Sequence, residues 1–219
     1  MKTQLPITVD NIRRIHNERR KEISARLSEF RQIHRSGTEE RFWEEMVFCF
    51  FTGGCSAAMG LRSIEAVRPL LASGTQEEIA AALSGVHRYP NARARYVVES
   101  REFLTANHKM KIRKTLMDFD CGLERRDWLA KTRGIKGLGY KEASHFLRNV
   151  GFTGYAILDK HVLNCLAELK LIDDPKPPAT RSRYIAVENI VRELAAESEV
   201  GFDELDLVLW SMKTNAILK

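Results

Sequence analysis

A lysine and an aspartate eighteen positions apart are the residues of this sequence whose types and surroundings suit covalent chemistry. Lys141 follows the glycine-rich run GIKGLG at 134–139 and falls in the first turn of the helix expected next. A cation there opposes the helix dipole, and a residue that breaks a local rule is often functional. The positive field and partial burial favour the neutral amine, which is the nucleophilic form. An exposed lysine on a tolerant surface is the alternative.

Asp159 follows the apolar run 155–158 and begins another expected helix. Backbone N–H groups at such a position keep a carboxylate ionised and fix its direction. A plain N-cap role is the alternative, and it is compatible with a functional one. Lys141 and Asp159 lie on successive helices joined by a short loop, so both are expected to face one cleft. An amine with a nearby anion suits attack on a carbon that develops positive charge.

The segment before Lys141 predicts a helix, a tight hairpin and a second helix over about 125–151. Gly137 and Gly139 allow positive φ and let backbone N–H groups approach another chain closely. These donors precede a helix N-terminus, which attracts phosphate, and Lys136 adds a positive charge. Contacts of this kind position a protein on DNA without reading its sequence. A plain turn between two helices, closed by glycines, remains the alternative.

The elements around this segment are helices, and the fold class is all-α. Apolar residues recur at three-to-four spacing, while no segment alternates with the period of a strand. Thr38 and Thr75 have the residue types that cap helices, and Thr75 with Glu78 forms a capping box. About nine or ten helices are expected: 10–34, 38–52, 56–71, 75–85, one from Asn91 through Leu104, one up to Arg133, 140–150, 159–169, one from Thr180 and one from Asp203.

The net charge and the spacing of the cysteines limit which partners and cofactors are expected. The 219 residues carry a formal charge of +6 and a pI of about 9.2, which favours a polyanionic partner such as nucleic acid. No apolar run reaches the ~18 residues of a membrane helix, and residues 1–20 lack the apolar centre of a signal peptide, so a cytoplasmic location is expected. Buried free thiols, with neither metal nor cofactor, are expected because the spacing of four cysteines fits no zinc or iron–sulfur pattern. They are Cys49, Cys55, Cys121 and Cys165.

The segment IKGLGYK at 135–141, followed by Asp159 in ILDKHVL, resembles the helix-hairpin-helix motif of base-excision DNA glycosylases. Within that superfamily the chain is similar to the archaeal-type 8-oxoguanine DNA glycosylase/AP lyases. The similarity lies in length, in the phrase GYKEASHFLRNVG, and in a last helix with Trp210 before Lys219. It covers most of the chain and is closest over 134–163. The resemblance implies one glycosylase domain over 1–219, built from two helical lobes with a central cleft.

The same resemblance implies a mechanism and a partner. A monomer would bind double-stranded DNA containing an oxidised purine, in the cytoplasm and associated with the nucleoid, and flip the damaged nucleotide into a pocket. Lys141 would attack the sugar C1′ and expel the base, and the resulting Schiff base would permit strand cleavage by β-elimination. Asp159 would stabilise the positive charge that develops on the sugar and help to activate the nucleophile.

Three residues are candidates for the base pocket. The resemblance implies that Lys219 reads the oxidised purine, while Trp210 and Tyr89 are candidates for stacking on it. A frayed terminus, core packing and loop packing are the respective alternatives. Nearby arginines at 88, 93 and 95 would contact phosphate or form a solvated face. The phrase TGGCS at 52–56 differs from the Asn- or Gln-bearing phrase of many relatives, which leaves the wedging residue open.

Two other functions stay open. A related enzyme for another damaged base is the first, although the iron–sulfur cysteines of endonuclease III-like members are missing and alkyl-base members generally lack the lysine. A non-catalytic helix-hairpin-helix DNA-binding protein is the second. It would give no reason for Lys141 and Asp159 to occupy the positions of a lyase motif.

Overall fold

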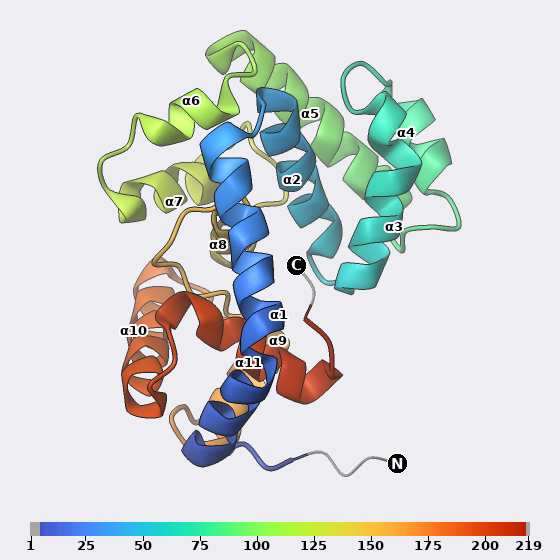
Figure 1. Ribbon diagram of the computed structural model, residues 1–219. Helices are drawn as coiled ribbons and strands as arrows, with labels where there is room; N and C mark the ends of the chain where they lie inside the picture. The colour runs from blue at the N-terminus through green and yellow to red at the C-terminus, as the bar shows by residue number, and fades with distance from the viewer. Residues whose placement is uncertain (1–4, 218–219) are drawn as a thin grey trace. The chain divides into compact units, whose positions relative to one another are not determined.

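The structure is a computed structural model that describes residues 5–217, and helices account for all its regular elements (Figure 1). Eleven α-helices, one 3-10 helix and no strand occur within these residues, which confirms the all-α fold class. The elements are α1 (Val9–Ser36), α2 (Glu39–Thr52), α3 (Ala57–Val67), η1 (Arg68–Leu70), α4 (Gln76–Leu83), α5 (Pro90–His108), α6 (Ile112–Met117), α7 (Gly122–Lys131), α8 (Tyr140–Asn149), α9 (Lys160–Glu168), α10 (Arg181–Ser198) and α11 (Phe202–Thr214).

Four helices, α2, α4, α9 and α10, begin at the residues that the sequence predicts as their first. Thr38 accepts a hydrogen bond from the Arg41 N–H, and Thr180 accepts one from Arg183 in the same way. Thr75 and Glu78 form the full capping box at the start of α4. Each such contact satisfies backbone donors that the first turn leaves without a partner.

Four predicted boundaries differ from the structure, and a proline accounts for two of them. Asn91 does not cap α5, which begins at Pro90 after Tyr89; proline at the first position has the required φ without needing its missing N–H. Asp203 lies inside the first turn of α11, whose N-cap is Gly201. The third helix ends at Val67 instead of Leu71, and a 3-10 turn that contains a proline follows it. The helix before the hairpin ends at Lys131, and α6 was not predicted at all.

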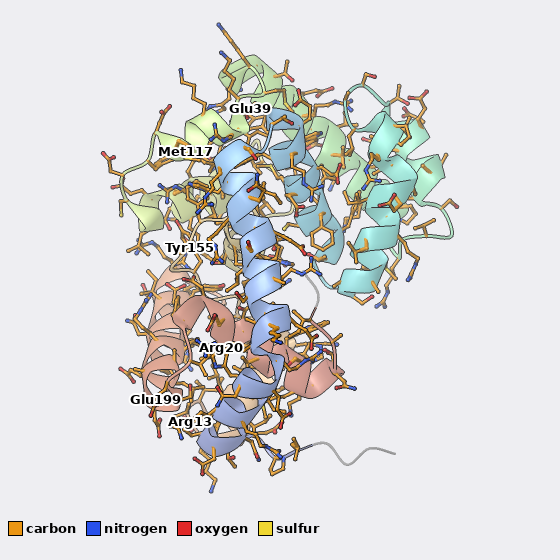
Figure 2. All side chains as sticks on the ribbon, in the orientation of Figure 1. Arg13, Arg20, Glu39, Met117, Tyr155 and Glu199 are labelled. Atoms are coloured by element: carbon orange, nitrogen blue, oxygen red, sulfur yellow. The ribbon has the colours of Figure 1, made fainter. Side chains whose placement is uncertain are left out.

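The described residues fall into two compact units. The first unit comprises 5–31 and 151–217, which is α1 up to Arg31 together with α9, α10 and α11. Within it, α11 packs against both α9 and α10. Arg13 of α1 lies 3.4 Å from the Glu199 carboxylate just after α10 (Figure 2), and His16 Nε2 lies 2.9 Å from Glu204 Oε2 of α11. These contacts attach α1 to the C-terminal helices.

The second unit comprises residues 32–150, with α2 at its centre. Helix α2 packs against α3, α5, α6 and α8, and the stretch from Glu45 to Thr52 is buried without interruption. An apolar helix of this kind, buried all round, is typical of the centre of a helical domain. Helix α8, which carries Lys141, therefore packs directly on the core helix of its unit. The cleft and the two-lobed arrangement expected from the sequence stay predictions.

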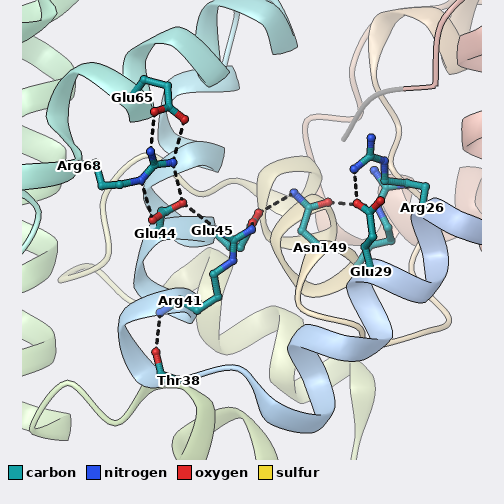
Figure 3. Close-up of polar contacts among 10 residues, drawn as sticks. Arg26, Glu29, Thr38, Arg41, Glu44, Glu45, Glu65, Arg68 and Asn149 are labelled. Atoms are coloured by element: carbon teal, nitrogen blue, oxygen red, sulfur yellow. Dashed lines mark hydrogen bonds and ion pairs between the residues drawn. The ribbon is translucent and has the colours of Figure 1, made fainter.

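A buried polar network fixes the far end of α8 to α2 (Figure 3). The Glu45 carboxylate, fully buried, accepts hydrogen bonds from Arg41 Nη2 at 2.6 Å and from Asn149 Nδ2 at 3.2 Å. Arg148 Nε donates to Asn149 Oδ1 at 3.2 Å. A buried carboxylate is costly unless it is paired in this way. The network therefore sets the position of the helix whose opposite end carries the candidate nucleophile.

Candidate active site

The hairpin before α8 lies against α5, and two of its glycines are required by that contact. Gly137 has a φ of +72°, and a side-chain carbon there would lie 2.6 Å from Cδ2 of the Tyr96 ring. A side-chain carbon on Gly134 would lie 2.0 Å from Cδ2 of the Phe103 ring. The Lys136 N–H donates to Ser100 Oγ at 2.8 Å, which fixes the hairpin to α5 at a third point.

Helix α8 begins at Tyr140 without a side-chain cap, because its N-cap residue is Gly139. Gly139 is exposed, so the positive end of the helix is open to an anion at the surface of this unit. Lys136 has an ion pair with Glu99 of α5, at 3.5 Å between Nζ and Oε2, and both side chains are about two-fifths exposed. An exposed pair of this kind contributes little stability, so a phosphate can replace Glu99 at small cost.

Lys141 occupies the second position of α8, and its side chain is 24% exposed. Its Nζ lies 3.5 Å from Oε1 of the neighbouring residue Glu142, whose side chain is 18% exposed. Sequence reasoning missed Glu142, although a carboxylate at the third position of a helix is itself a recognisable signal. The predicted first-turn position of Lys141 is confirmed, and its carboxylate partner is new.

Tyr140, the first residue of α8, is held by α7. Its hydroxyl donates to Asp127 Oδ1 at 3.1 Å, and Asp127 Oδ2 pairs with Lys131 Nζ at 2.7 Å. Burial of the phenol is the main cause that raises the pKa of Tyr140, and the hydrogen bond to Asp127 adds to it. The phenol therefore stays neutral and acts as a fixed donor that anchors the start of α8 to α7.

An aromatic and basic group of side chains lies at the start of α5, on the helix that contacts the hairpin. Tyr89 is 42% exposed, and the guanidinium carbons of Arg88 and Arg93 lie 5.3 and 5.8 Å from its ring centre. Arg93 also lies 5.2 Å from the ring centre of Tyr96, the residue that faces Gly137. Such contacts are typical of cation–π pairs. Tyr89 therefore has its exposed ring beside two cations, which suits stacking on a base and contact with phosphate.

His87 positions Tyr89 and was not identified from the sequence. The ring is buried, its Nε2 lies 3.0 Å from the Phe51 carbonyl oxygen, and its Nδ1 accepts the Tyr89 N–H at 2.9 Å. Because Nδ1 is an acceptor, the proton is on Nε2 and is donated to Phe51. Burial lowers the pKa of His87, and the charge of Arg93 lowers it further. A neutral imidazole thus ties the loop before α5 to α2.

Asp159 lies in the first unit, where it caps α9. Its Oδ1 accepts from the His161 N–H at 2.8 Å and the Val162 N–H at 2.9 Å. The segment that leads to it is fixed by α10, because Ala156 donates its N–H to the buried Glu188 at 2.9 Å and accepts from the Tyr184 hydroxyl at 2.8 Å. The cap role predicted for Asp159 is confirmed, and the carboxylate is rigidly oriented.

Trp210 of α11 lies beside this aspartate cap. Its ring meets the ring of His161 edge-on, with centres 6.2 Å apart, and His161 is two residues after Asp159. Trp210 is half-buried, which leaves part of the indole exposed. The structure thus brings Trp210 close to the turn that holds Asp159 within the first unit. Within the second unit, Lys136 and Gly137 lie against the middle of α5, and Lys141 follows them in α8. Tyr89 lies at the start of α5. Lys219 lies outside the described residues.

The four cysteines differ in burial. Cys49 and Cys165 are buried, and burial raises the pKa of Cys165 to about 12. Cys55 is half-buried and Cys121 is exposed, so the expectation that all four thiols are buried is wrong for these two. Across residues 5–217 the structure has no cluster of His, Cys, Asp and Glu that could hold a metal, and no helix there has the length and apolar character to span a membrane.

Comparison with known proteins covers most of the chain. Residues 23–200 match the family model Ogg-HhH, described as 8-oxoguanine DNA glycosylase. A Korarchaeum cryptofilum protein named 8-oxoguanine DNA glycosylase/AP lyase is 36% identical over 96% of this chain and 97% of its own length. The Methanocaldococcus jannaschii enzyme, solved in complex with a 15-mer DNA containing 8-oxoguanine, has a TM-score of 0.87 at 33% identity, covering 96% of this chain and 99% of that one.

A second solved structure agrees. The 8-oxoguanine DNA glycosylase of Thermotoga maritima has a TM-score of 0.86 at 35% identity, covering 96% of this chain and 98% of that one. Fold, length and sequence therefore point to the same group of proteins, and the sequence-based assignment is confirmed. This chain belongs to the Ogg-HhH family of 8-oxoguanine DNA glycosylases.

Proposed function

We propose that this chain excises 8-oxoguanine from duplex DNA and then cleaves the strand at the abasic site, as a bifunctional DNA glycosylase and AP lyase. Membership of the 8-oxoguanine DNA glycosylase family over residues 23–200 carries the proposal. Two further observations support it: relatives named 8-oxoguanine DNA glycosylase/AP lyase match nearly their full length, and one structural relative was solved with DNA containing 8-oxoguanine.

The proposed chemistry assigns one step to each of two residues. Lys141 supplies the amine that attacks C1′ of the damaged nucleotide, and loss of the base leaves a Schiff base that undergoes β-elimination. Asp159 supplies negative charge to the sugar as positive charge develops on it. Its two backbone hydrogen bonds support this role, because they fix the direction of the carboxylate.

The proposed DNA contacts follow from the uncapped N-terminus of α8 and from the exposed parts of the Tyr89 and Trp210 rings. The uncapped start of α8 at Gly139, the Gly137 turn and Lys136 form a phosphate site. Tyr89 and Trp210 stack on the flipped base, and Lys219 reads its oxidised edge. We also propose that the protein acts as a monomer. It would bind DNA in the cytoplasm, in association with the nucleoid.

Borohydride trapping tests the proposal directly. The protein is incubated with a duplex carrying a single 8-oxoguanine, sodium borohydride is added, and a covalent protein–DNA band is sought. The Lys141→Gln variant runs beside the wild type, since glutamine keeps the length of the side chain but removes the amine. We expect a band with 8-oxoguanine that the variant lacks, while the variant still binds the damaged duplex.

Duplexes with thymine glycol and without damage separate the other functions. A covalent band with thymine glycol alone would show that the substrate is another damaged base and that the proposed mechanism is retained. Binding without any band or strand scission on every duplex would favour a DNA-binding protein or a monofunctional glycosylase. Cleavage retained in Lys141→Gln would remove Lys141 as the nucleophile.

A further inference from the structure

The Lys141 amine has a carboxylate partner on its own helix. Glu142 Oε1 lies 3.5 Å from Lys141 Nζ, and both side chains are largely buried. Residues at i and i+1 of a helix do not face each other, so the side chains of Lys141 and Glu142 have to bend toward one another to meet. The pair is therefore not a by-product of helical spacing. It lies where the proposed nucleophile has to lose a proton before it can attack.

The first turn of α8 leaves room for one oxygen of this carboxylate. Glu142 is the third residue of α8, the position from which a carboxylate reaches back toward the N-cap residue. A side-chain carbon on Gly139 would lie 3.3 Å from Glu142 Oε2, so the missing side chain leaves room for that oxygen. With Oε2 directed toward Gly139, Oε1 is directed toward Lys141.

The turn after α2 lies beside the carboxylate on its other side, and Arg93 of α5 contacts the same turn. A side-chain carbon on Gly53 would lie 3.6 Å from Glu142 Oε1 and 3.4 Å from Arg93 Nη2. Arg93 also donates a hydrogen bond from Nη2 to the Gly53 carbonyl oxygen. The charge of Arg93 therefore flanks the carboxylate from α5. On α7, the charged groups Asp127 and Lys131 pair with each other beside Tyr140.

We propose that Glu142 is the proton acceptor for the Lys141 amine during base excision, an inference that rests on the function proposed above. One proton passes from the ammonium at Nζ to Glu142 Oε1, which leaves a neutral amine. Its lone pair forms the bond to C1′, the C1′–N9 bond breaks, and the electron pair leaves with the base. The base takes up a proton from solvent, and Glu142 releases its own to solvent.

The distance agrees with this role. Proton transfer needs the two heavy atoms within about 2.6–3.2 Å, and such contacts are often longer in an enzyme without its substrate and shorten when it binds. The pair at 3.5 Å needs only a small side-chain movement to reach that range. Both side chains lie on the first turn of one helix, so no backbone rearrangement is required.

Glu142→Gln tests the inference, because the amide keeps the size of the side chain and cannot accept a proton. We expect single-turnover excision of 8-oxoguanine to slow by about 10²–10³-fold, within the usual contribution of a general base, with unchanged affinity for the duplex. The residual rate should rise about tenfold per pH unit, since hydroxide must now remove the proton. Added formate should restore part of the rate in this variant alone. The excision rate of Glu142→Asp should lie between those of the wild type and Glu142→Gln.

Glu77→Gln is the matched control, because Glu77 is an exposed carboxylate in the first turn of α4 and should leave the rate unchanged. Glu142→Gln with normal or faster excision would overturn the inference and leave Glu142 as a counterion. So would slow excision without the steep pH dependence and without rescue by formate, since a structural role gives that result. Lys141→Gln is trapped in parallel: if it loses the covalent band while Glu142→Gln is normal, the inference fails and the proposed function stands.

Discussion

Asp159 combines two roles that one substitution can separate, because its carboxylate caps α9 and also carries the charge proposed to act on the sugar. Asparagine caps helices about as well as aspartate, so it should keep the bonds to the His161 and Val162 N–H groups. Asp159→Asn should therefore preserve the fold and slow base excision by roughly 10²–10³-fold, the size of a lost preorganised electrostatic contact. Single-turnover excision of 8-oxoguanine measures the rate.

Circular dichroism and the thermal midpoint are the controls for this variant, and both should match the wild type. Excision at a near-normal rate would show that the carboxylate is only a helix cap. A lowered thermal midpoint together with slow excision would show that asparagine failed as a cap, and the charge would then need to be tested by a different substitution.

Gly137 shows how a single residue limits an element, because its φ of +72° and its contact with Tyr96 both exclude a side chain. Gly137→Ala should lower the free energy of unfolding by roughly 1–2 kcal/mol from backbone strain alone, with the overlap against the ring added to it. Gly85→Ala is a matched control, since Gly85 has the same φ of +72° and nothing within 4 Å of its side-chain position.

Urea denaturation of both variants separates the two causes. The excess destabilisation of Gly137→Ala over Gly85→Ala is the cost of moving Tyr96 and the hairpin apart. That excess should be accompanied by weaker binding of undamaged duplex, which Gly85→Ala should not show. Equal losses of stability in the two variants would mean that the hairpin adapts freely and that its fit against α5 is unimportant.

His87 links the loop that carries Tyr89 to the pH of the solution. Burial lowers its pKa in the folded protein, so the unfolded chain, with a pKa near 6.5, binds the proton more tightly. Stability from this residue is therefore complete above about pH 6.5 and is lost as the pH falls toward the lowered folded value. His87→Asn keeps an acceptor for the Tyr89 N–H and serves as the reference. The free energy of unfolding of the wild type should exceed that of this variant by less and less as the pH falls through this window.

Unfolding free energies at several pH values between 5 and 8 measure the effect, because groups common to both proteins cancel in the difference. An advantage of constant size across these pH values would contradict a neutral, buried His87. It would mean that the ring accepts a proton without leaving its place between Phe51 and Tyr89.

Elements whose signals are local were predictable from the sequence, and elements held by distant partners were not. The capping box at Thr75 and the cap at Asp159 depend on three or four consecutive residues, so both were found. Helix α6 was missed because its first N–H groups are satisfied by Glu39 of α2, which accepts from Arg113 at 2.6 Å and from Lys114 at 3.3 Å. No pattern within 112–117 shows a partner more than seventy residues away.

The candidate site divides in the same way. Lys141 and the glycines before it were identified because a short motif carries them. The roles of Glu142 and His87 depend on Gly53, Arg93 and Phe51, which other helices bring to the site. A pattern along one helix does not show His87's partner, so His87 appears only once the helices are packed. Glu142 does have a signal within its own helix, a carboxylate at the third position, and that signal was overlooked.

At the scale of the whole molecule, a formal charge of +6 makes duplex binding depend on salt. Each phosphate that a Lys or Arg neutralises releases counterions, so the logarithm of the binding constant should fall linearly with the logarithm of salt concentration, by about 0.9 per phosphate. Fluorescence anisotropy with undamaged duplex at several salt concentrations gives the slope. A flat dependence would contradict a cationic DNA-binding surface.

Two variants then divide the hairpin's contribution into its charged and uncharged parts. Lys136→Gln removes a cation whose ion pair with Glu99 is exposed and exchangeable, so the slope should become shallower by about one unit. Gly137→Ala displaces backbone N–H donors and leaves every charge in place, so affinity should fall at all salt concentrations while the slope stays unchanged. If Lys136→Gln leaves the slope unchanged, Lys136 remains with Glu99 in the complex, and the phosphate is bound by the uncapped end of α8 alone.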